Sequence, residues 1–188
     1  MCLTVRLNLH LGLIQALAQL MSKVTALNVM TEFDPEWRSP CEQGEPDTQG
    51  MISWHPVHRE PANVNWTPID EAIGLQLHED VKTYYSSYYA ANIDVTLPRG
   101  SLTLLMPWNE EDMQRLQQNL IGHLLMKKRL RQSPTLFIAC TDDEDYLISL
   151  DNNSGGVYLE RVGQAPQELL APSLTEFLHL LLRDGEFS

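Results

Sequence analysis

The stretch NEEDMQRLQQNLIGHLLMKKRLRQSPTLFIACTDDEDYLISLDNNSGGVYLER, residues 109–161, predicts one long helix followed by three strands. Asn109 is a favourable N-cap, and the acidic residues 110–112 complement the positive end of the helix dipole. Apolar residues then recur at helical spacing, at Met113, Leu116, Leu120, Ile121, Leu124 and Leu125. Basic side chains crowd 127–131, where a helix favours positive charge, so we expect the helix to end there.

Predicted strands, joined as hairpins, precede and follow this helix in the sequence. β-rich apolar runs occur at 93–97, 102–105, 135–140, 146–150 and 157–161. Pro98–Ser101 predicts a tight turn between the first two runs, and the Asp-Asn-Asn-Ser-Gly-Gly segment at 151–156 predicts a hairpin between the last two. Consecutive hairpins favour an antiparallel sheet.

Helices are predicted at both ends of the chain. Leu13, Leu17, Leu20, Val24 and Leu27 follow an amphipathic pattern. Polar residues interrupt the hydrophobic start of the chain, which favours this helix over a signal peptide or a membrane-inserted segment. At the other end, Ser173 and Glu176 predict a capping box.

The segments between these elements differ in character. Residues 67–91 predict a single helix with a tyrosine stripe. Residues 31–61, rich in Pro, Gly and acidic side chains, predict irregular structure with a short strand at about 51–55. We therefore expect one domain over residues 1–188, of the α+β class (α/β in the broad sense), with a largely antiparallel sheet flanked by helices.

Acidic residues dominate the charge: 25 Asp and Glu stand against 13 Lys and Arg, for a net charge of −12. Such an excess repels phosphate backbones and anionic lipid surfaces and attracts basic partners. Nucleic acid and bare membrane are therefore not expected partners, whereas a basic protein segment is. Solubility alone is the alternative explanation of the charge.

Neither a metal site nor a catalytic site is predicted, and no cofactor is expected. The three cysteines are widely separated and form no C-x-x-C motif. His55 and His58 with Glu60 lack a further defined zinc ligand. No serine lies in a nucleophile elbow. A hydrolase that uses Cys41 or the histidine pair remains an alternative, but the sequence favours a protein that is not an enzyme.

Four segments resemble the central signature of the Syd family. They are Trp108–Met113, Gln118–His123, Lys128–Leu130 and Pro134–Ala139. Ser39–Cys41, Trp54, Val64–Asn65, the Tyr84 region and Ser173–Phe177 extend the likeness over most of the chain. Residues 1–10 depart from it, so they are interpreted as an N-terminal extension or a wrongly assigned start site.

The resemblance implies a fold of the SMI1/KNR4 type and a regulatory role. It also implies a monomer, peripheral on the cytoplasmic side of the inner membrane, that binds SecY when SecY is not properly complexed. Binding would sequester surplus SecY or restrain a faulty translocase. An immunity-type module that binds another basic protein or a toxin is the alternative on the same fold.

The resemblance further implies a concave acidic surface that faces SecY. By charge density, the candidate contributors are Glu42, Glu45, Asp47, Glu110 and Glu111, with Trp54 as an aromatic anchor. For the two glutamates at the start of the predicted helix, stabilisation of the helix dipole is an equally good explanation.

Overall fold

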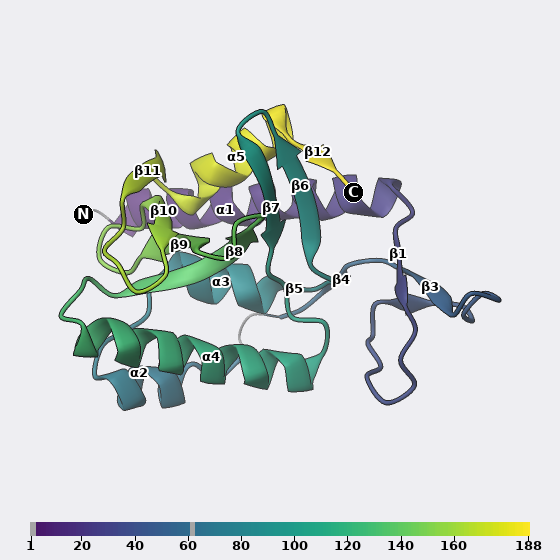
Figure 1. Cartoon of the computed structure of the whole chain (residues 1–188), viewed down its shortest axis with the longest axis horizontal. Coiled ribbons are helices and arrows are strands. Elements are labelled where there is room, and N and C mark those ends of the chain that lie inside the picture. The colour runs from purple at the N-terminus through teal and green to yellow at the C-terminus, as the bar shows by residue number, and fades with distance from the viewer. Residues whose placement is uncertain (1–2, 61–62) are drawn as a thin grey trace.

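The protein, described here by a computed structural model over residues 3–60 and 63–188, is built around a curled antiparallel sheet. Its strand order is β11-β10-β9-β8-β7-β6-β12. The strands are β6 (Ile93–Leu97), β7 (Gly100–Leu104), β8 (Thr135–Thr141), β9 (Tyr146–Asp151), β10 (Val157–Arg161), β11 (Glu168–Ala171) and β12 (Glu186–Phe187). Each strand pairs antiparallel with its neighbours, which confirms the predicted α+β fold (Figure 1).

Helices pack around this sheet. Helix α1 (Leu3–Ala26) contacts α5 (Leu174–Asp184) and α3 (Glu79–Ser87), while α5 also contacts β6 and β11. Helix α4 (Glu110–Arg129) contacts β8 and the short helix α2 (Thr67–Ile73). In the described part of the chain, no helix is both long enough and apolar enough to cross a membrane.

Helix α4 forms as the sequence predicts. The Asn109 side chain accepts the backbone N–H of Asp112 at 2.8 Å, and the Asp112 carboxylate accepts that of Trp108 at 2.9 Å. This reciprocal cap satisfies two backbone donors at the helix start. The buried face includes Met113, Leu120 and Leu124. Lys127 is also buried, although the sequence places it among the basic residues at the helix end.

The single helix predicted over 67–91 is wrong, because α2 and α3 are separate helices. Gly74 adopts a left-handed conformation with φ of 73°, which ends α2. His78 then caps α3 by accepting the backbone N–H of Asp80. Tyr84 and Tyr85 lie on α3 and are fully buried, whereas Tyr88 and Tyr89 follow the helix and are half-buried, so the tyrosine stripe is part core and part rim.

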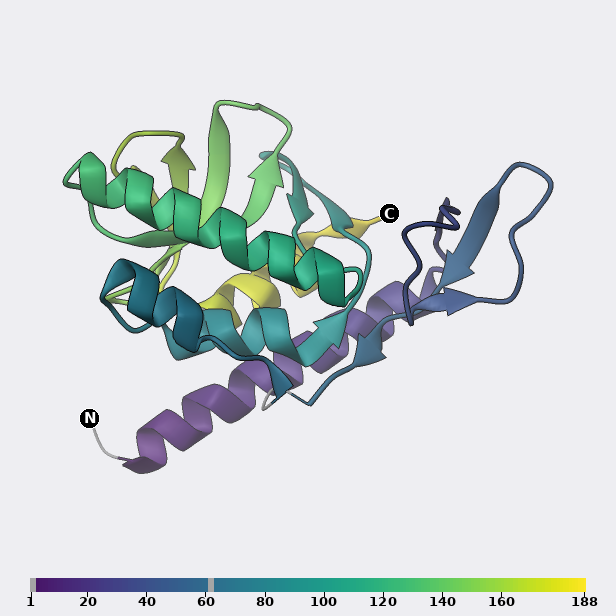
Figure 2. The same cartoon turned by 90° about the horizontal axis from the view of Figure 1, so that it is seen from below.

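A small three-stranded sheet occupies the acidic segment after α1. Strand β3 (Met51–Trp54) lies between β1 (Met30–Glu32) and β2 (Glu42–Gln43), and it confirms the short strand predicted there. Strand β4 (Val57–His58) then pairs with β5 (Tyr88–Tyr89). Figure 2 shows the β2–β3 hairpin projecting from the body of the molecule.

Candidate partner-binding surface

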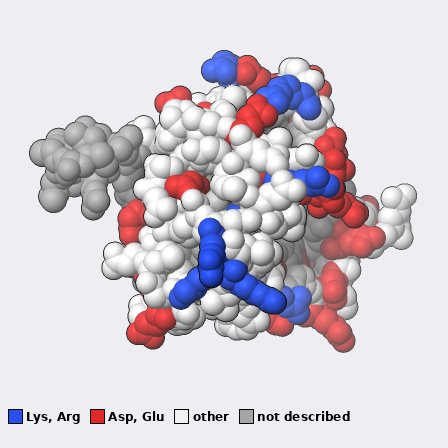
Figure 3. Space-filling view, turned by 60° about the vertical axis from the view of Figure 1, so that its left-hand side comes forward, with Lys and Arg blue, Asp and Glu red and all other residues white. Residues whose placement is uncertain are grey.

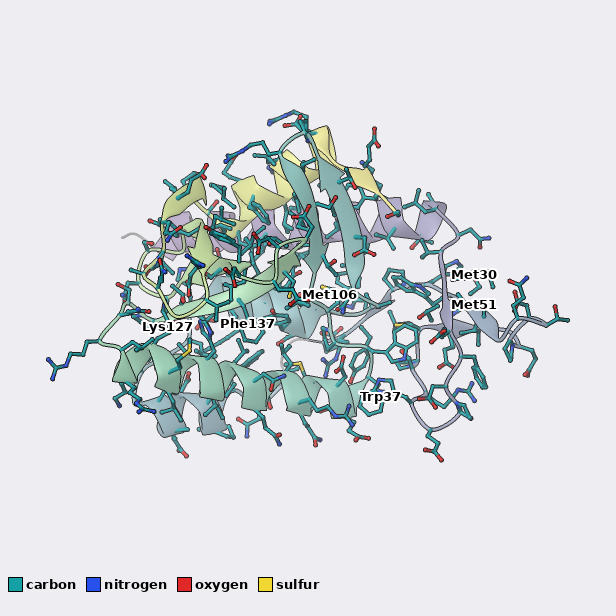
Figure 4. All side chains as sticks on the ribbon, viewed as in Figure 1. Met30, Trp37, Met51, Met106, Lys127 and Phe137 are labelled. Carbon is teal, nitrogen blue, oxygen red and sulfur yellow. The ribbon has the colours of Figure 1, made fainter. Side chains whose placement is uncertain are left out.

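Residues 29–58, which we name the docked loop, are fastened to the start of α4 through Trp108. The indole N–H of Trp108 donates to the carbonyl of Trp37 at 3.1 Å, and the hydroxyl of Ser39 donates to the carbonyl of Trp108. The ring of Trp54 lies edge-on to Trp108, with centroids 6.0 Å apart. Figure 4 shows Trp37 at this end of α4. These contacts hold the segment, with its small sheet, against the helix.

Glu110 is held by two side chains from other segments. Its Oε2 accepts the hydroxyl of Tyr89 at 2.6 Å and lies 2.9 Å from Nη2 of Arg59. The Arg59 guanidinium stacks on the Tyr89 ring at 3.9 Å. Burial, and then the hydrogen bond to Glu110, raise the pKa of Tyr89 to about 12. Since the Glu110 side chain is still 65% exposed, its carboxylate is both oriented and accessible.

The neighbouring carboxylates differ sharply in exposure. Glu111 is as exposed as Glu110 and pairs with Arg115 at 3.3 Å, a surface ion pair of small energetic value. Glu42, by contrast, has a side chain only 5% exposed. It pairs with Arg38 and accepts the backbone N–H of Ser39 at 3.1 Å, so it holds the docked loop together.

Trp54, the expected aromatic anchor, is 3% exposed. Besides supporting Trp108, it lines a hollow of about 430 Å³ together with Met30, Asn92 and Asp94. Because so little of the side chain is exposed, the main role of Trp54 in this conformation is to pack the docked loop. Its participation in binding stays a prediction.

Glu45 and Asp47 lie in the turn that joins β2 to β3, and both are exposed. The Asp47 carboxylate accepts the backbone N–H groups of Gln49 and Met51, at 2.8 and 2.9 Å, and so shapes this turn. The structure therefore divides the predicted residues into two groups. Glu42, Trp54, Glu110 and Glu111 surround Trp108 and the start of α4, whereas Glu45 and Asp47 sit on the projecting hairpin.

The two ends of α4 differ in charge. The docked loop carries six carboxylates and one arginine, and three more carboxylates begin α4. Lys128, Arg129 and Arg131 are exposed at and beyond the opposite end of that helix. In Figure 3, the largest group of basic side chains lies low on the face shown, with others at the top and right, and acidic side chains occupy the right-hand edge and parts of the left. Carboxylates therefore outnumber cations at the start of α4 and in the docked loop, although Arg38, Arg59 and Arg115 pair with three of them.

The alternative catalytic groups have no supporting geometry. Cys41 is fully buried, and burial raises the pKa of its thiol, which disfavours the reactive thiolate. His55 and His58 belong to no group of three metal-binding side chains within residues 3–60 and 63–188. His58 instead packs edge-on against Tyr88, with centroids 5.2 Å apart.

Sequence reasoning missed Arg59, Tyr89 and Asp94. The first two orient Glu110 from positions 51 and 21 residues away in the chain, and no local pattern marks such contacts. Asp94 alternates with buried Ile93 and Val95 in β6, so its outward direction was predictable from strand periodicity. The position of Asp94 in the hollow beside Trp54 was not predictable, because the docked loop forms the opposite wall of that hollow.

Comparison with known proteins places this geometry in a family. The family model described as Syd protein (SUKH-2) matches residues 11–182. The chain belongs to the Syd family. It is 47% identical over 149 residues to Protein Syd of Pseudoalteromonas atlantica, covering 78% of this chain and 80% of that protein. It is 45% identical to Protein Syd of Alteromonas mediterranea, with 79% and 82% covered, and 41% identical to that of Aeromonas hydrophila, with 81% and 82% covered.

These matches confirm the resemblance seen in the sequence signature. Two of its segments form structural features already described, because Trp108–Met113 holds the α4 cap and Pro134–Ala139 leads into the central strand β8. The signature thus includes both a framework strand and the point where the docked loop is fastened. The SMI1/KNR4 assignment of the fold stays a prediction.

Proposed function

We propose that this Syd-family chain binds the cytoplasmic loops of SecY and acts by binding rather than by catalysis. The observation that carries the proposal is the docked loop, in which a dense set of carboxylates is fixed beside the oriented Glu110. Cytoplasmic loops of membrane proteins are rich in Lys and Arg. A negative surface of this kind accelerates encounter with such loops and favours them over acidic partners.

In this proposal the accessible carboxylates Glu45, Glu110 and Glu111 meet the partner, while Glu42 and Trp54 stabilise the surface beneath them. The hollow beside Trp54, bordered by Asp94, receives part of the bound loop. The protein would act on the cytoplasmic side of the inner membrane, held there through SecY. Preference for uncomplexed SecY would let it sequester surplus subunits or restrain a faulty translocase.

The test is binding of the purified protein to detergent-solubilised SecYEG and to peptides of its large cytoplasmic loops, at low and raised salt. Glu45→Lys and Glu111→Lys are the informative variants, because neither carboxylate supports the backbone. Each is expected to weaken binding by roughly tenfold at low salt, about 1.4 kcal/mol. Raised salt should shrink the difference, since the Debye length falls to about 3 Å at 1 M.

Glu71→Lys is the matched control, because Glu71 is exposed on α2 and the reversal changes the net charge equally. It should alter binding less than twofold if position matters and not merely total charge. Equal losses of affinity in all three variants would show that the interaction depends only on net charge. Absence of binding to SecYEG at every salt concentration would sink the proposal and favour the immunity-type alternative.

A further inference from the structure

A second concavity lies inside the curl of the main sheet. Helix α5 and the sheet enclose an open cavity of about 330 Å³. Its floor is apolar and includes Leu97, Leu102, Ile148, Leu159, Leu170 and Phe177. Ligand pockets span roughly 300–1,000 Å³, so this one suits a single bulky side chain better than a long segment.

An arginine of the protein itself crosses the mouth of this cavity. Arg99, in the β6–β7 turn, pairs with Glu168 of β11 through two hydrogen bonds of 2.7 and 3.1 Å. Strands β8, β9 and β10 separate β7 from β11 in the sheet, so the pair spans the curl. Both side chains border the cavity and are exposed, 73% for Arg99 and 44% for Glu168. An ion pair this exposed is weak and opens readily.

The same mouth carries further negative charge. Asp142 and Asp143, in the turn between β8 and β9, also line the cavity. Neither forms an ion pair with any residue that the structure describes, although Asp142 accepts the backbone N–H of Ser101 at 3.5 Å. Asp143 also accepts the backbone N–H of Asp145 at 3.0 Å. Three carboxylates and one cation, Arg99, thus border the same apolar cavity. This combination complements an apolar side chain that is adjacent to a basic one.

We propose that the cavity receives a bulky apolar side chain of a polypeptide partner, whose neighbouring Arg or Lys displaces Arg99 from Glu168. In the free protein Arg99 makes the ion pair with Glu168 that the partner's basic residue would make in the complex. The inference rests on the proposed function in naming the occupant, a segment of a SecY cytoplasmic loop in which an apolar residue adjoins a basic one. It adds a specificity that a purely electrostatic surface lacks, because the floor selects for the apolar neighbour.

The direct test uses small probes. N-acetyl-leucyl-arginine amide, titrated into the ¹⁵N-labelled protein, is expected to shift the backbone amide signals of Gly100, Thr141 and Leu169 at millimolar concentration. N-acetyl-seryl-arginine amide and N-acetyl-leucyl-glutamine amide each lack one of the two features and should shift them much less. Equal shifts with all three probes, or none with the first, would overturn the inference.

Variants extend the test to the larger partner. Arg99→Ala frees Glu168 and removes the one cation that lines the cavity. This variant should therefore bind both the leucyl-arginine probe and the loop peptides several-fold more tightly. Arg183→Ala is the matched control, because Arg183 is 69% exposed and pairs with Asp184 away from the cavity. Leu169→Trp, at a rim position 53% exposed, should narrow the mouth and weaken binding without disturbing the core.

The outcomes separate this inference from the proposed function. If SecYEG binds but Arg99→Ala and Leu169→Trp behave as Arg183→Ala does, the cavity is not part of the interface and only the inference fails. If the leucyl-arginine probe occupies the cavity but SecYEG never binds, the assignment of SecY fails. The recognition chemistry of the cavity then stands, with another basic polypeptide as its occupant.

Discussion

Lys127 and Glu160 form an ion pair in which both side chains are completely buried, with Nζ 2.9 Å from Oε1. The remaining polar atoms of the pair are also used. The Lys127 ammonium donates to the carbonyl of Gln164 at 2.8 Å, and the Ser149 hydroxyl donates to Glu160 Oε2 at 2.7 Å. The pair joins α4 to the sheet, on the side where Figure 4 labels Lys127.

Removing one partner of this pair should destabilise the fold severely. Lys127→Met leaves the Glu160 carboxylate buried without its counter-ion, which typically costs about 3–5 kcal/mol. The double variant Lys127→Met with Glu160→Leu removes both charges and should recover much of that loss. Urea unfolding of the two single variants and the double variant measures the coupling. Additive losses would show that the two residues act independently.

Tyr84 and Tyr85 should respond oppositely to loss of the hydroxyl. Tyr85 donates to the carbonyl of Phe137 at 2.7 Å, whereas the buried Tyr84 hydroxyl has no hydrogen-bond partner among the described residues. Tyr85→Phe is therefore expected to lower the free energy of unfolding by about 1 kcal/mol. Tyr84→Phe should leave it unchanged or raise it. Thermal or urea unfolding of the two variants tests this prediction. A larger loss of stability in Tyr84→Phe than in Tyr85→Phe would mean that the Tyr84 hydroxyl is hydrogen-bonded.

His123 should make the protein less stable in mild acid. Burial lowers the pKa of His123 below its ordinary value of 6.5, and nearby Lys127 acts in the same direction while Glu160 opposes it. The unfolded chain therefore takes up the proton first as the pH falls. The contribution of neutral His123 to the free energy of unfolding is fully present above pH 6.5. It is lost as the pH falls from there through the lower pKa of the folded protein.

The measurement is the free energy of unfolding between pH 7.5 and 5, a window chosen around the ordinary histidine pKa of about 6.5. His123→Gln should reduce the fall in the free energy of unfolding with decreasing pH, because a glutamine side chain takes up no proton in this range. The exposed His179→Gln variant is the control and should keep the slope of the unmodified protein. Identical slopes in all three proteins would exclude His123 as the source.

Gly155 should tolerate alanine less well than Gly163. Both have left-handed backbones, with φ of 75° and 79°, a conformation that costs an L-residue about 1–2 kcal/mol. A Cβ on Gly155 would also lie 2.8 Å from the His78 ring, whereas one on Gly163 would meet no described atom within 4 Å. Unfolding of Gly155→Ala should therefore occur at clearly lower urea concentration. Equal midpoints would mean that His78 moves aside freely.

Much of the framework was predictable because local chemistry specifies it. The Asn109 cap, the hairpin at 151–156 and the apolar face of α4 each have sequence signals that tertiary contacts reinforce. The apolar periodicity predicted one continuous helix through Gly74. The structure ends α2 at that residue, because its backbone is left-handed. Strands β11 and β12 are short, and β12 exists through pairing with the distant strand β6, so their sequences carry little signal.

The candidate surface was less predictable than the fold. Charge density drew attention to the docked loop and to the start of α4, but it could not separate the buried Glu42 from the exposed Glu111. That difference depends on Arg38, four residues away across a turn that the sequence does not specify. The burial of Lys127 likewise depends on Glu160, which lies on another element.

The docked loop also supplies an optical signal. Of the four tryptophans in the chain, Trp37, Trp54 and Trp108 meet where the loop is fastened, and the guanidinium of Arg115 lies 4.0 Å from the Trp37 ring. Three of the four tryptophans therefore report on this one region. A partner that reaches the acidic end would change the colour or intensity of that emission, so its arrival can be followed in real time without attaching a dye.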